Sequence, residues 1–370
     1  MKKKIKVMQI ILDLGTGGVE KFMVDLALHM DNAKYDTSVV CLVSKKNSIF
    51  ENVLERNKIK VTYLDMSMKY FDLTTMWKLY KIIKNEKPDV VHVHTYIMKM
   101  VLLPILLNKI PVKIHTVHVP AEVESKECSK TALKLAYKVG KVVPVGVSKS
   151  VKEGLEKLFN IEEAKLIYNG IDLNKFNNFR IEETKNKSVK FINIARFMPE
   201  KNHEMLIKAF AVVSEKYPDV KLSLVGKGKL QDNMKSMVKE LGIEEKVEFL
   251  DLREDIPELL NESDVFVLTS NYEGFGLVLA EAMACRVPVI STNVGAVSEL
   301  IDNGKNGILV DNGDLNSLIK NMILFIENRN LRDKYAEAGF QSVKKFDLKY
   351  TIKAYEELYM NGLKGEDYDR

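Results

Sequence analysis

Two glutamates eight residues apart, Glu273 and Glu281, bracket the segment best suited to chemistry. They follow an apolar run, residues 265–268, that predicts a short buried strand, and Glu281 lies in a helical pattern. A glycine-bearing turn between a strand and a helix presents backbone N–H groups to the space above the sheet, which suits an anion such as a pyrophosphate. The carboxylates are about two helical turns apart, so both can reach one elongated ligand. The alternative is a solvated helix start with favourable acidic residues.

Two cations, Arg196 and Lys201, lie in a predicted turn after the strand-like residues 190–195. Pro199 stops the strand, and Asn202 can cap the helix that follows. A guanidinium fork and an ammonium point charge placed there could stabilise a diphosphate as it leaves during group transfer. A surface Arg and Lys on a loop is the alternative.

Glycines and histidines mark the ends of strands in the first half of the chain. Gly17 and Gly18 belong to a glycine-rich turn, but Glu20 takes the third glycine position of G-x-G-x-x-G, which argues against a nicotinamide dehydrogenase. Period-2 alternation places His92 and His94 on one face of a strand, with His92 packed against a helix. Because no acidic or cysteine partner has suitable spacing, we expect no metal site.

Strand-like apolar runs alternate with helical patterns along the whole chain, which predicts two parallel sheets covered on both faces. The predicted strands are residues 4–12, 35–42, 60–64, 89–94, 112–118, 142–147, 165–168, 190–195, 221–225, 246–250, 264–269, 288–291 and 307–310. Helical patterns include residues 18–30, 72–85, 148–159, 203–216 and 350–363. We therefore expect an α/β protein of two Rossmann-like doubly wound domains facing across a cleft, with ligands at the carboxyl ends of the strands. The predicted N-terminal domain is residues 1–172, with a returning helix at 350–365; residues 173–188 form a linker and residues 189–349 the C-terminal domain.

The segment Glu-Gly-Phe-Gly-Leu-Val-Leu-Ala-Glu-Ala-Met-Ala, residues 273–284, resembles the E-x7-E motif of retaining nucleotide-sugar glycosyltransferases with the GT-B architecture, family 4. Arg196 and Lys201 resemble its R-x4-K pair, and residues 225–228 its Val-Gly-x-Gly turn. Asp251 and Arg286 stand where glycine is usual in the family. The resemblance covers essentially the whole chain. The residues to which it assigns roles are, for catalysis, Arg196, Lys201, Glu273 and His118; for the donor, Gly17, Gly18, Gly226, Gly228, Arg253, Gly274, Phe275, Gly276, Leu277 and Glu281; and for the acceptor, His94.

This resemblance implies retaining transfer of a hexosyl or N-acetylhexosaminyl group without a required metal or cofactor. It implies a nucleotide-sugar donor, with UDP favoured over GDP, and a glycan or lipid-linked acceptor in bacterial-type cell-surface polysaccharide assembly. Glu273 would orient the donor sugar and Glu281 would hold the ribose. A GT-B-fold sugar-nucleotide epimerase and a non-catalytic nucleotide-sugar-binding module remain alternatives.

Charge is distributed unevenly along the 370 residues. Residues 1–180 carry 30 Lys and Arg against 19 Asp and Glu, a net of +11, and the remainder 26 against 32, a net of −6. We expect an anionic membrane surface, contacted by Lys69, Trp77, Lys78, Lys81, Lys84 and the segment 126–141, rather than nucleic acid, for which no binding module is recognisable. A solvated basic surface on a core helix is the alternative. Three scattered cysteines and no apparent signal peptide favour a cytoplasmic protein, peripheral at the inner face of the cell membrane.

Overall fold

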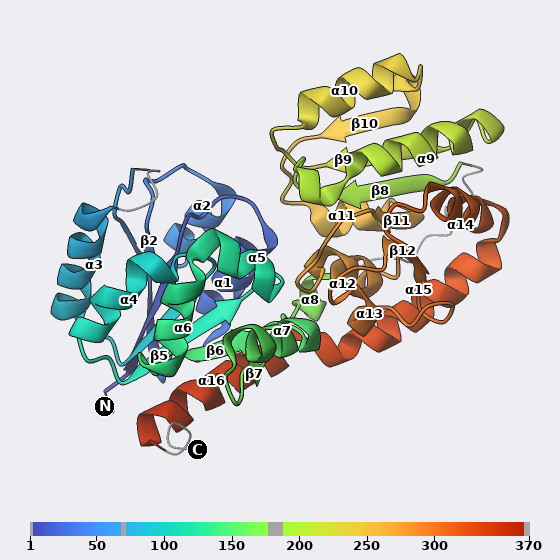
Figure 1. Ribbon diagram of the computed structural model, residues 1–370. Coiled ribbons are helices and arrows are strands. Elements are labelled where there is room, and N and C mark those ends of the chain that lie inside the picture. Colours follow the sequence, from blue (N-terminus) through green and yellow to red (C-terminus); the bar gives the residue numbers. More distant parts are fainter. Residues whose placement is uncertain (1–2, 68–71, 177–187, 366–370) are drawn as a thin grey trace. The chain divides into compact units, whose positions relative to one another are not determined.

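The computed structural model describes residues 3–67, 72–176 and 188–365 and divides the chain into two compact units (Figure 1). The N-terminal unit comprises Met1–Asn169 and Lys349–Arg370, and the C-terminal unit comprises Gly170–Leu348. Each unit is a parallel sheet covered by helices, so the α/β class with two Rossmann-like domains is confirmed.

The N-terminal sheet has seven strands in the order β3-β2-β1-β4-β5-β6-β7, all parallel. Its strands are β1 Ile5–Ile11, β2 Tyr35–Cys41, β3 Lys60–Tyr63, β4 Val90–His94, β5 Val112–Val117, β6 Val143–Gly146 and β7 Lys165–Leu166. The strand order reverses between β1 and β4. The central strands are buried on both faces, which explains why they read as continuous apolar runs.

Several helices of the N-terminal unit begin at side chains that satisfy their free N–H groups. Asp72 caps α3, Ser148 caps α7, and Ser48 forms a capping box with Glu51 at α2. The helices are α1 Gly18–His29, α2 Ile49–Arg56, α3 Leu73–Glu86, α4 Met98–Leu107, α5 Ala121–Cys128, α6 Lys130–Lys138 and α7 Lys149–Phe159. The last helix of the chain, α16 Leu348–Lys364, also belongs to this unit for nearly its whole length and buries Tyr355 and Tyr359 completely.

The C-terminal sheet has six parallel strands in the order β10-β9-β8-β11-β12-β13, and its order reverses between β8 and β11. The strands are β8 Lys190–Ile194, β9 Lys221–Val225, β10 Val247–Leu250, β11 Val265–Leu268, β12 Val289–Thr292 and β13 Ile308–Val310. The helices are α8 Leu173–Phe176, η1 Pro199–Lys201, α9 His203–Lys216, α10 Gln231–Glu240, η2 Glu244–Lys246, α11 Ile256–Asn261, α12 Leu277–Ala284, α13 Val297–Leu300, α14 Leu315–Glu327, α15 Arg329–Val343 and η3 Lys344–Phe346. Its core includes Phe191, Phe210 and Phe325, none of which is exposed.

The predicted strands and helices agree with the structure, with most ends within one or two residues. The predicted linker, 173–188, lies mostly outside the described residues, which omit 177–187. Its first four residues instead form α8, whose Phe176 is buried and accepts a hydrogen bond from Cys285 Sγ through its carbonyl oxygen. The boundary between the units falls at Asn169 and Gly170.

Candidate functional site

Most of the predicted site residues lie at the carboxyl ends of strands on either side of the two points where the sheets reverse their order. In the C-terminal unit, Arg196 follows β8 and Glu273 follows β11. In the N-terminal unit, Gly17 follows β1 and His94 ends β4. Loops diverge at such a switch point and leave space above the sheet for a ligand. Each unit therefore has the backbone arrangement of a ligand-binding half-site.

Lys201 and Glu273 form the most closely coupled pair of the C-terminal half-site. Lys201 Nζ donates to Glu273 Oε1 at 2.6 Å, and Ser270 Oγ donates to the same oxygen at 2.7 Å. The two side chains of the ion pair are only 18% and 10% exposed, so water screens the pair weakly. The carboxylate is thereby held in one orientation, with one oxygen already occupied by two donors.

Arg196 lies on the same turn with a looser partner. Its Nη2 lies 3.6 Å from Glu200 Oε1, and its side chain is 48% exposed. The turn itself is anchored to the loop after β11, because Asn271 N donates to Glu200 O at 2.7 Å and Asn271 Nδ2 donates to Pro199 O at 3.1 Å. Arg196 can thus leave its weak surface pair for an anion without disturbing the backbone.

Gly295 lies against the backbone of Glu273, and the sequence did not predict this contact. Its φ is +54°, and a Cβ at this position would lie 1.9 Å from Glu273 O. Ala296 N donates to that carbonyl oxygen, and Thr292 Oγ1 donates to Ser270 O at 2.6 Å. A glycine in a loop just after β12 was the only available signal, and Gly295 resembles an ordinary turn residue until its contact with Glu273 is known.

Gly226 and Gly228 serve first to bring two loops together. A Cβ at Gly226 would lie 2.2 Å from Ala195 O, and one at Gly228 would lie 2.4 Å from Phe197 O. Larger residues would push the loop after β9 away from the turn that carries Arg196. The predicted contact of these glycines with a nucleotide remains a prediction.

In the turn 274–276, the backbone of Gly276 starts α12 and the side chain of Phe275 packs in the interior. Gly276, at φ +87°, caps α12 in a left-handed conformation that favours glycine. Phe275 is buried and packs edge-on against Phe346 with ring centroids 5.2 Å apart, and Leu277 is buried at the first residue of α12. The side chain of Phe275 packs in the protein interior, so its predicted contact with the donor can involve only its backbone and stays a prediction. Gly274 lies buried beside Glu273.

Glu281 lies within α12 and is 3% exposed, which is an unusual position for a carboxylate.

Arg253 is paired within its own loop. Its Nε donates to Asp255 Oδ1 at 2.7 Å, and this partner raises the pKa of the guanidinium. Asp251 accepts from Gln231 Nε2 at 3.2 Å and lies 3.2 Å from Lys227 Nζ, and these contacts lower the pKa of its carboxyl. This residue, where glycine is usual, thus ties the loops after β9 and β10 together.

His118 and His94 form a buried chain in the N-terminal half-site. His94 Nε2 lies 2.8 Å from Gln9 Oε1, which can only accept, so in the neutral ring the proton is on Nε2. His94 Nδ1 then accepts from His118 Nε2 at 3.3 Å, which leaves a lone pair on His118 Nδ1, an atom without a partner among the described residues. Burial lowers the pKa of His118 to about 3 and that of His94 well below its usual value, with neighbouring histidines adding to both shifts.

His94 is fully buried with both ring nitrogens engaged, one of them by His118. Its predicted contact with an acceptor stays a prediction. His92 packs against a helix as predicted, since its Nδ1 lies 2.7 Å from the hydroxyl of Tyr359 in α16. Thr116 Oγ1 lies 2.6 Å from His92 Nε2 and 2.9 Å from the Tyr355 hydroxyl.

The glycine turn after β1 has a backbone that other residues could adopt. Gly17 is extended at φ −157°, and a Cβ there would meet only the carboxylate end of Glu20, at 2.4 Å. Gly18 is the first residue of α1. The backbone does not explain why residues 17 and 18 are both glycine, whereas close backbone contacts explain Gly226 and Gly295.

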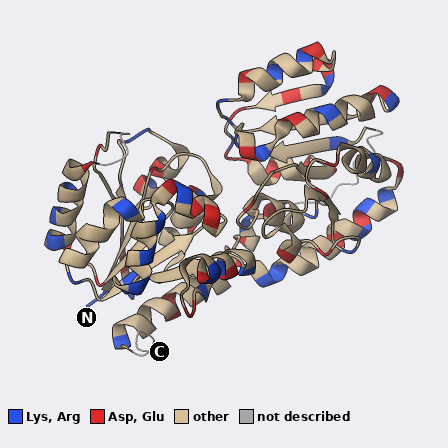
Figure 2. Cartoon of the chain, in the orientation of Figure 1, with Lys and Arg blue, Asp and Glu red and all other residues tan. Residues whose placement is uncertain are grey.

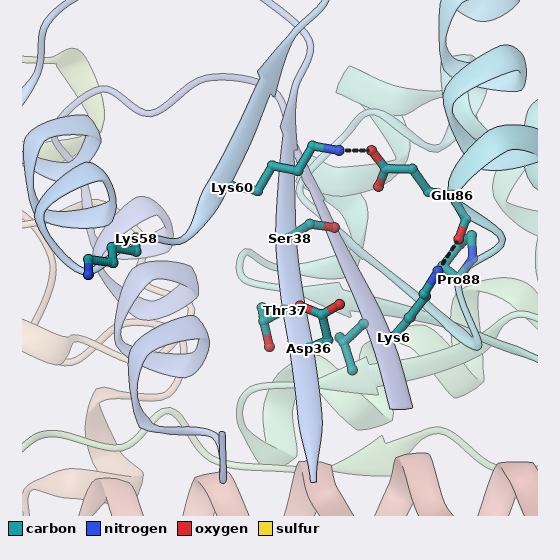
Figure 3. Close-up of a pocket in the computed structure, with 9 residues that line it drawn as sticks. Lys6, Asp36, Thr37, Ser38, Lys58, Lys60, Glu86 and Pro88 are labelled. Carbon is teal, nitrogen blue, oxygen red and sulfur yellow. Dashed lines mark hydrogen bonds and ion pairs between the residues drawn. The ribbon is translucent and has the colours of Figure 1, made fainter. Parts of the chain in front are cut away.

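A hollow in the N-terminal unit lies at the opposite edge of the sheet, among the amino ends of β1, β2 and β3 (Figure 3). Two of its lysines are engaged by Glu86: Lys60 Nζ lies 2.5 Å from Glu86 Oε1, and Lys6 Nζ donates to Glu86 O at 3.0 Å. It contains none of the predicted site residues.

Within residues 3–67, 72–176 and 188–365, no group of three or more His, Cys, Asp or Glu could hold a metal ion. Over the same ranges, no helix is long and apolar enough to cross a bilayer.

Comparisons with known proteins agree with this arrangement. The family described as Glycosyltransferase Family 4 matches residues 16–175, and that described as Glycosyl transferases group 1 matches residues 174–342. An Escherichia coli UDP-Gal:alpha-D-GlcNAc-diphosphoundecaprenol alpha-1,3-galactosyltransferase is 27% identical over 93% of this chain and 95% of its own. The Bacillus anthracis N-acetyl-alpha-D-glucosaminyl L-malate synthase is 28% identical over 86% and 87%. The crystal structure of Anabaena HepE in complex with UDP and glucose superposes with a TM-score of 0.81 at 22% identity, covering 96% of this chain and all of that one, a likeness of fold.

Proposed function

We propose that this chain, which belongs to the GT-B glycosyltransferases of family 4, transfers a hexosyl or N-acetylhexosaminyl group from a UDP-sugar with retention of configuration. The observation that carries the proposal is the Lys201–Glu273 pair at the switch point of the C-terminal sheet. A cation beside a fixed carboxylate supports this proposal, because the cation could stabilise a diphosphate and the carboxylate could bind sugar hydroxyls.

Each residue has a defined part in the proposed reaction. Arg196 and Lys201 stabilise the negative charge that grows on the diphosphate, and no metal or cofactor is required for that role. Glu273 orients the sugar through the oxygen that Lys201 and Ser270 leave open, and Glu281 holds the ribose. His118 Nδ1 accepts from a hydroxyl of the bound sugar or acceptor.

In the proposed step, an acceptor oxygen forms a bond to the anomeric carbon on the face from which the diphosphate leaves. The bond between that carbon and the phosphate oxygen breaks, and the acceptor's proton passes to the departing phosphate. Glu273 is not assigned as a nucleophile in this step, because the acceptor oxygen bonds directly to the anomeric carbon.

We propose a lipid-linked or glycan acceptor, held by the N-terminal unit. The E. coli relative is named for a diphosphoundecaprenol acceptor, whereas the B. anthracis relative is named for L-malate. A lipid-linked acceptor would place the reaction at the inner face of the cell membrane, in the assembly of a bacterial-type surface polysaccharide.

The experiment incubates the protein with a panel of UDP- and GDP-sugars and with lipid-linked, glycan or small soluble acceptors. We expect UDP release that depends on acceptor, and a product whose anomeric proton coupling in NMR matches that of the donor. An inverted product would contradict retention. Conversion of the donor into its epimer in the absence of an acceptor would show that the protein is an epimerase and not a transferase.

A further inference from the structure

Three neighbouring helices of the N-terminal unit each expose a pair of large apolar side chains. The pairs are Leu73 and Trp77 on α3, Leu103 and Leu107 on α4, and Leu135 and Val139 on α6 and its C-cap. Each pair is spaced i, i+4, so its two members lie on the same side of their helix. These six residues are more than half of the eleven large hydrophobic residues that are exposed within the described part of the chain.

The three helices form a continuous layer. α3 packs against α4, and α4 packs against α6, as Figure 1 shows for the N-terminal unit. Right-handed crossovers place all three on the same face of the sheet, because each connects to a strand further along in the same direction of the strand order. We refer to the exposed surface of α3, α4 and α6 as the α3–α4–α6 face.

The charge of this layer is almost entirely positive. The three helices contain seven lysines and one acidic residue, Glu86, and Figure 2 shows the basic residues along α3 and α6. Five of these lysines form no ion pair with a carboxylate and donate no side-chain hydrogen bond within the described residues. They are Lys81, Lys84, Lys130, Lys134 and Lys138. A surface that is only basic and solvated would not need exposed leucines and an exposed tryptophan on the same helices.

Aromatic rings and lysines are stacked on α3. Trp77 and Tyr80 lie nearly parallel with ring centroids 5.2 Å apart, and Trp77 is 57% exposed. Lys81 Nζ lies 5.1 Å from the Trp77 ring and Lys84 Nζ lies 5.6 Å from the Tyr80 ring. An amphipathic ring beside a cation is the arrangement found where proteins enter the headgroup region of a bilayer.

We propose that the α3–α4–α6 face docks on an anionic phospholipid surface, with Trp77 and the four leucines entering the headgroup boundary and the free lysines meeting lipid phosphates. Charge complementarity selects this occupant, because lysines surround the apolar pairs and only one acidic residue lies on the three helices. Lys78 contributes less than the others, since its Nζ donates to Leu64 O at 2.7 Å. The predicted contact Lys69 lies outside the described residues.

The single tryptophan of the chain makes the test direct, since Trp77 lies in the proposed contact. The full-length protein is mixed with vesicles of phosphatidylcholine alone or with one third phosphatidylglycerol, at low and high salt. We expect flotation with the anionic vesicles at low salt, a shift of Trp77 emission to shorter wavelength, and loss of both at high salt as screening shortens.

Two double variants and a control separate the parts of the proposal. Leu103→Ser with Leu107→Ser should reduce flotation at least tenfold. Lys134→Gln with Lys138→Gln should reduce it roughly thirtyfold, the factor for about 1 kcal/mol at each of the two lysines. Val212→Ser with Leu241→Ser removes exposed apolar residues of the C-terminal unit and should leave flotation unchanged. Circular dichroism confirms that each variant is folded.

Equal recovery on neutral and anionic vesicles, an unchanged Trp77 emission, or equal loss in the control variant would overturn the docking surface. Sugar transfer is tested separately, because the variant with Leu103→Ser and Leu107→Ser should transfer sugar to a water-soluble acceptor, with release of UDP, at the wild-type rate. If the wild type transferred no sugar to any acceptor, the proposed function would be contradicted, and the vesicle-binding result would still stand.

Discussion

Lys201 Nζ donates to Glu273 Oε1 at 2.6 Å across two loops that are 72 residues apart in the sequence. The contact exists because β8 and β11 are neighbours in the sheet, which brings the ends of both strands to the switch point. Ser270 holds the same oxygen, and Gly295 allows the next loop to approach the glutamate backbone. Contacts within the protein thus fix Lys201, proposed for the diphosphate, and Glu273, proposed for the sugar, relative to each other.

Removal of either cation should slow transfer. Lys201→Ala or Arg196→Ala should lower kcat by at least about 10²-fold, or about 2.7 kcal/mol of barrier, because each group acts on charge that develops on the diphosphate. Steady-state UDP release at saturating donor measures the effect. Lys208→Ala is the control, since Lys208 forms an exposed pair with Glu204 on α9. Full activity in both site variants would remove their proposed roles.

The two glutamates should differ in their kinetics. Glu281→Ala should chiefly raise the KM for the donor, because a ribose contact is shared by the ground and transition states. Glu273→Ala should also lower kcat, since the carboxylate is proposed to lie beside the reacting sugar. In Glu273→Gln the KM should return part of the way to the wild-type value, whereas kcat should stay low. A pure KM effect of the same size in both alanine variants would refute this division.

Gly295 should be required for activity although it carries no functional group. Gly295→Ala forces a Cβ against Glu273 O, at a φ of +54°, and should lower kcat at least tenfold and lower Tm. Gly313→Ala is a matched control, since its φ is +84° but no atom lies within 4 Å of the added Cβ. The control should lose only about 1 kcal/mol of stability from backbone strain and keep its activity. Equal kcat in the two variants would show that the contact with Glu273 does not matter.

Buried neutral histidines should make the N-terminal unit sensitive to acid. The pKa of His118 is lowered from 6.5 to about 3, and those of His92 and His94 are lowered as well, so between these values the unfolded chain binds more protons. The stability from neutral burial is complete above about pH 6.5 and is lost as pH falls, by up to roughly 1.4 kcal/mol per pH unit for each histidine.

Urea unfolding between about pH 7 and 4.5, followed by the fluorescence of Trp77 in the same unit, measures this loss. His118→Asn should give a shallower dependence on pH than the wild type. A free energy of unfolding that stays constant over this range would contradict the burial of neutral histidines.

The sequence predicted the fold well because its strands are continuous apolar runs and its helices begin at recognisable caps such as Asp72 and Ser148. It also identified Lys201 and Glu273, whose residue types and spacing resemble a family pattern. It could not predict Gly295 or Ser270, since their importance comes from contacts between distant loops. It could not predict that the side chains of Phe275 and His94 are buried for a related reason: a residue type indicates what a side chain can bind, but its neighbours in the fold determine whether it lies in the core.

The central claim is that Arg196 and Lys201 bind the diphosphate of a nucleotide sugar, and nucleotide-induced thermal stabilisation tests it most directly. The Tm of the wild type is measured with UDP, GDP, ADP and uridine in the presence of a chelator, and again for Lys201→Ala and Arg196→Ala. We expect UDP to raise the Tm most, uridine to raise it little, and the UDP effect to fall sharply in both variants. A wild-type protein that no nucleoside diphosphate stabilises, or variants that UDP stabilises as strongly as the wild type, would contradict the account.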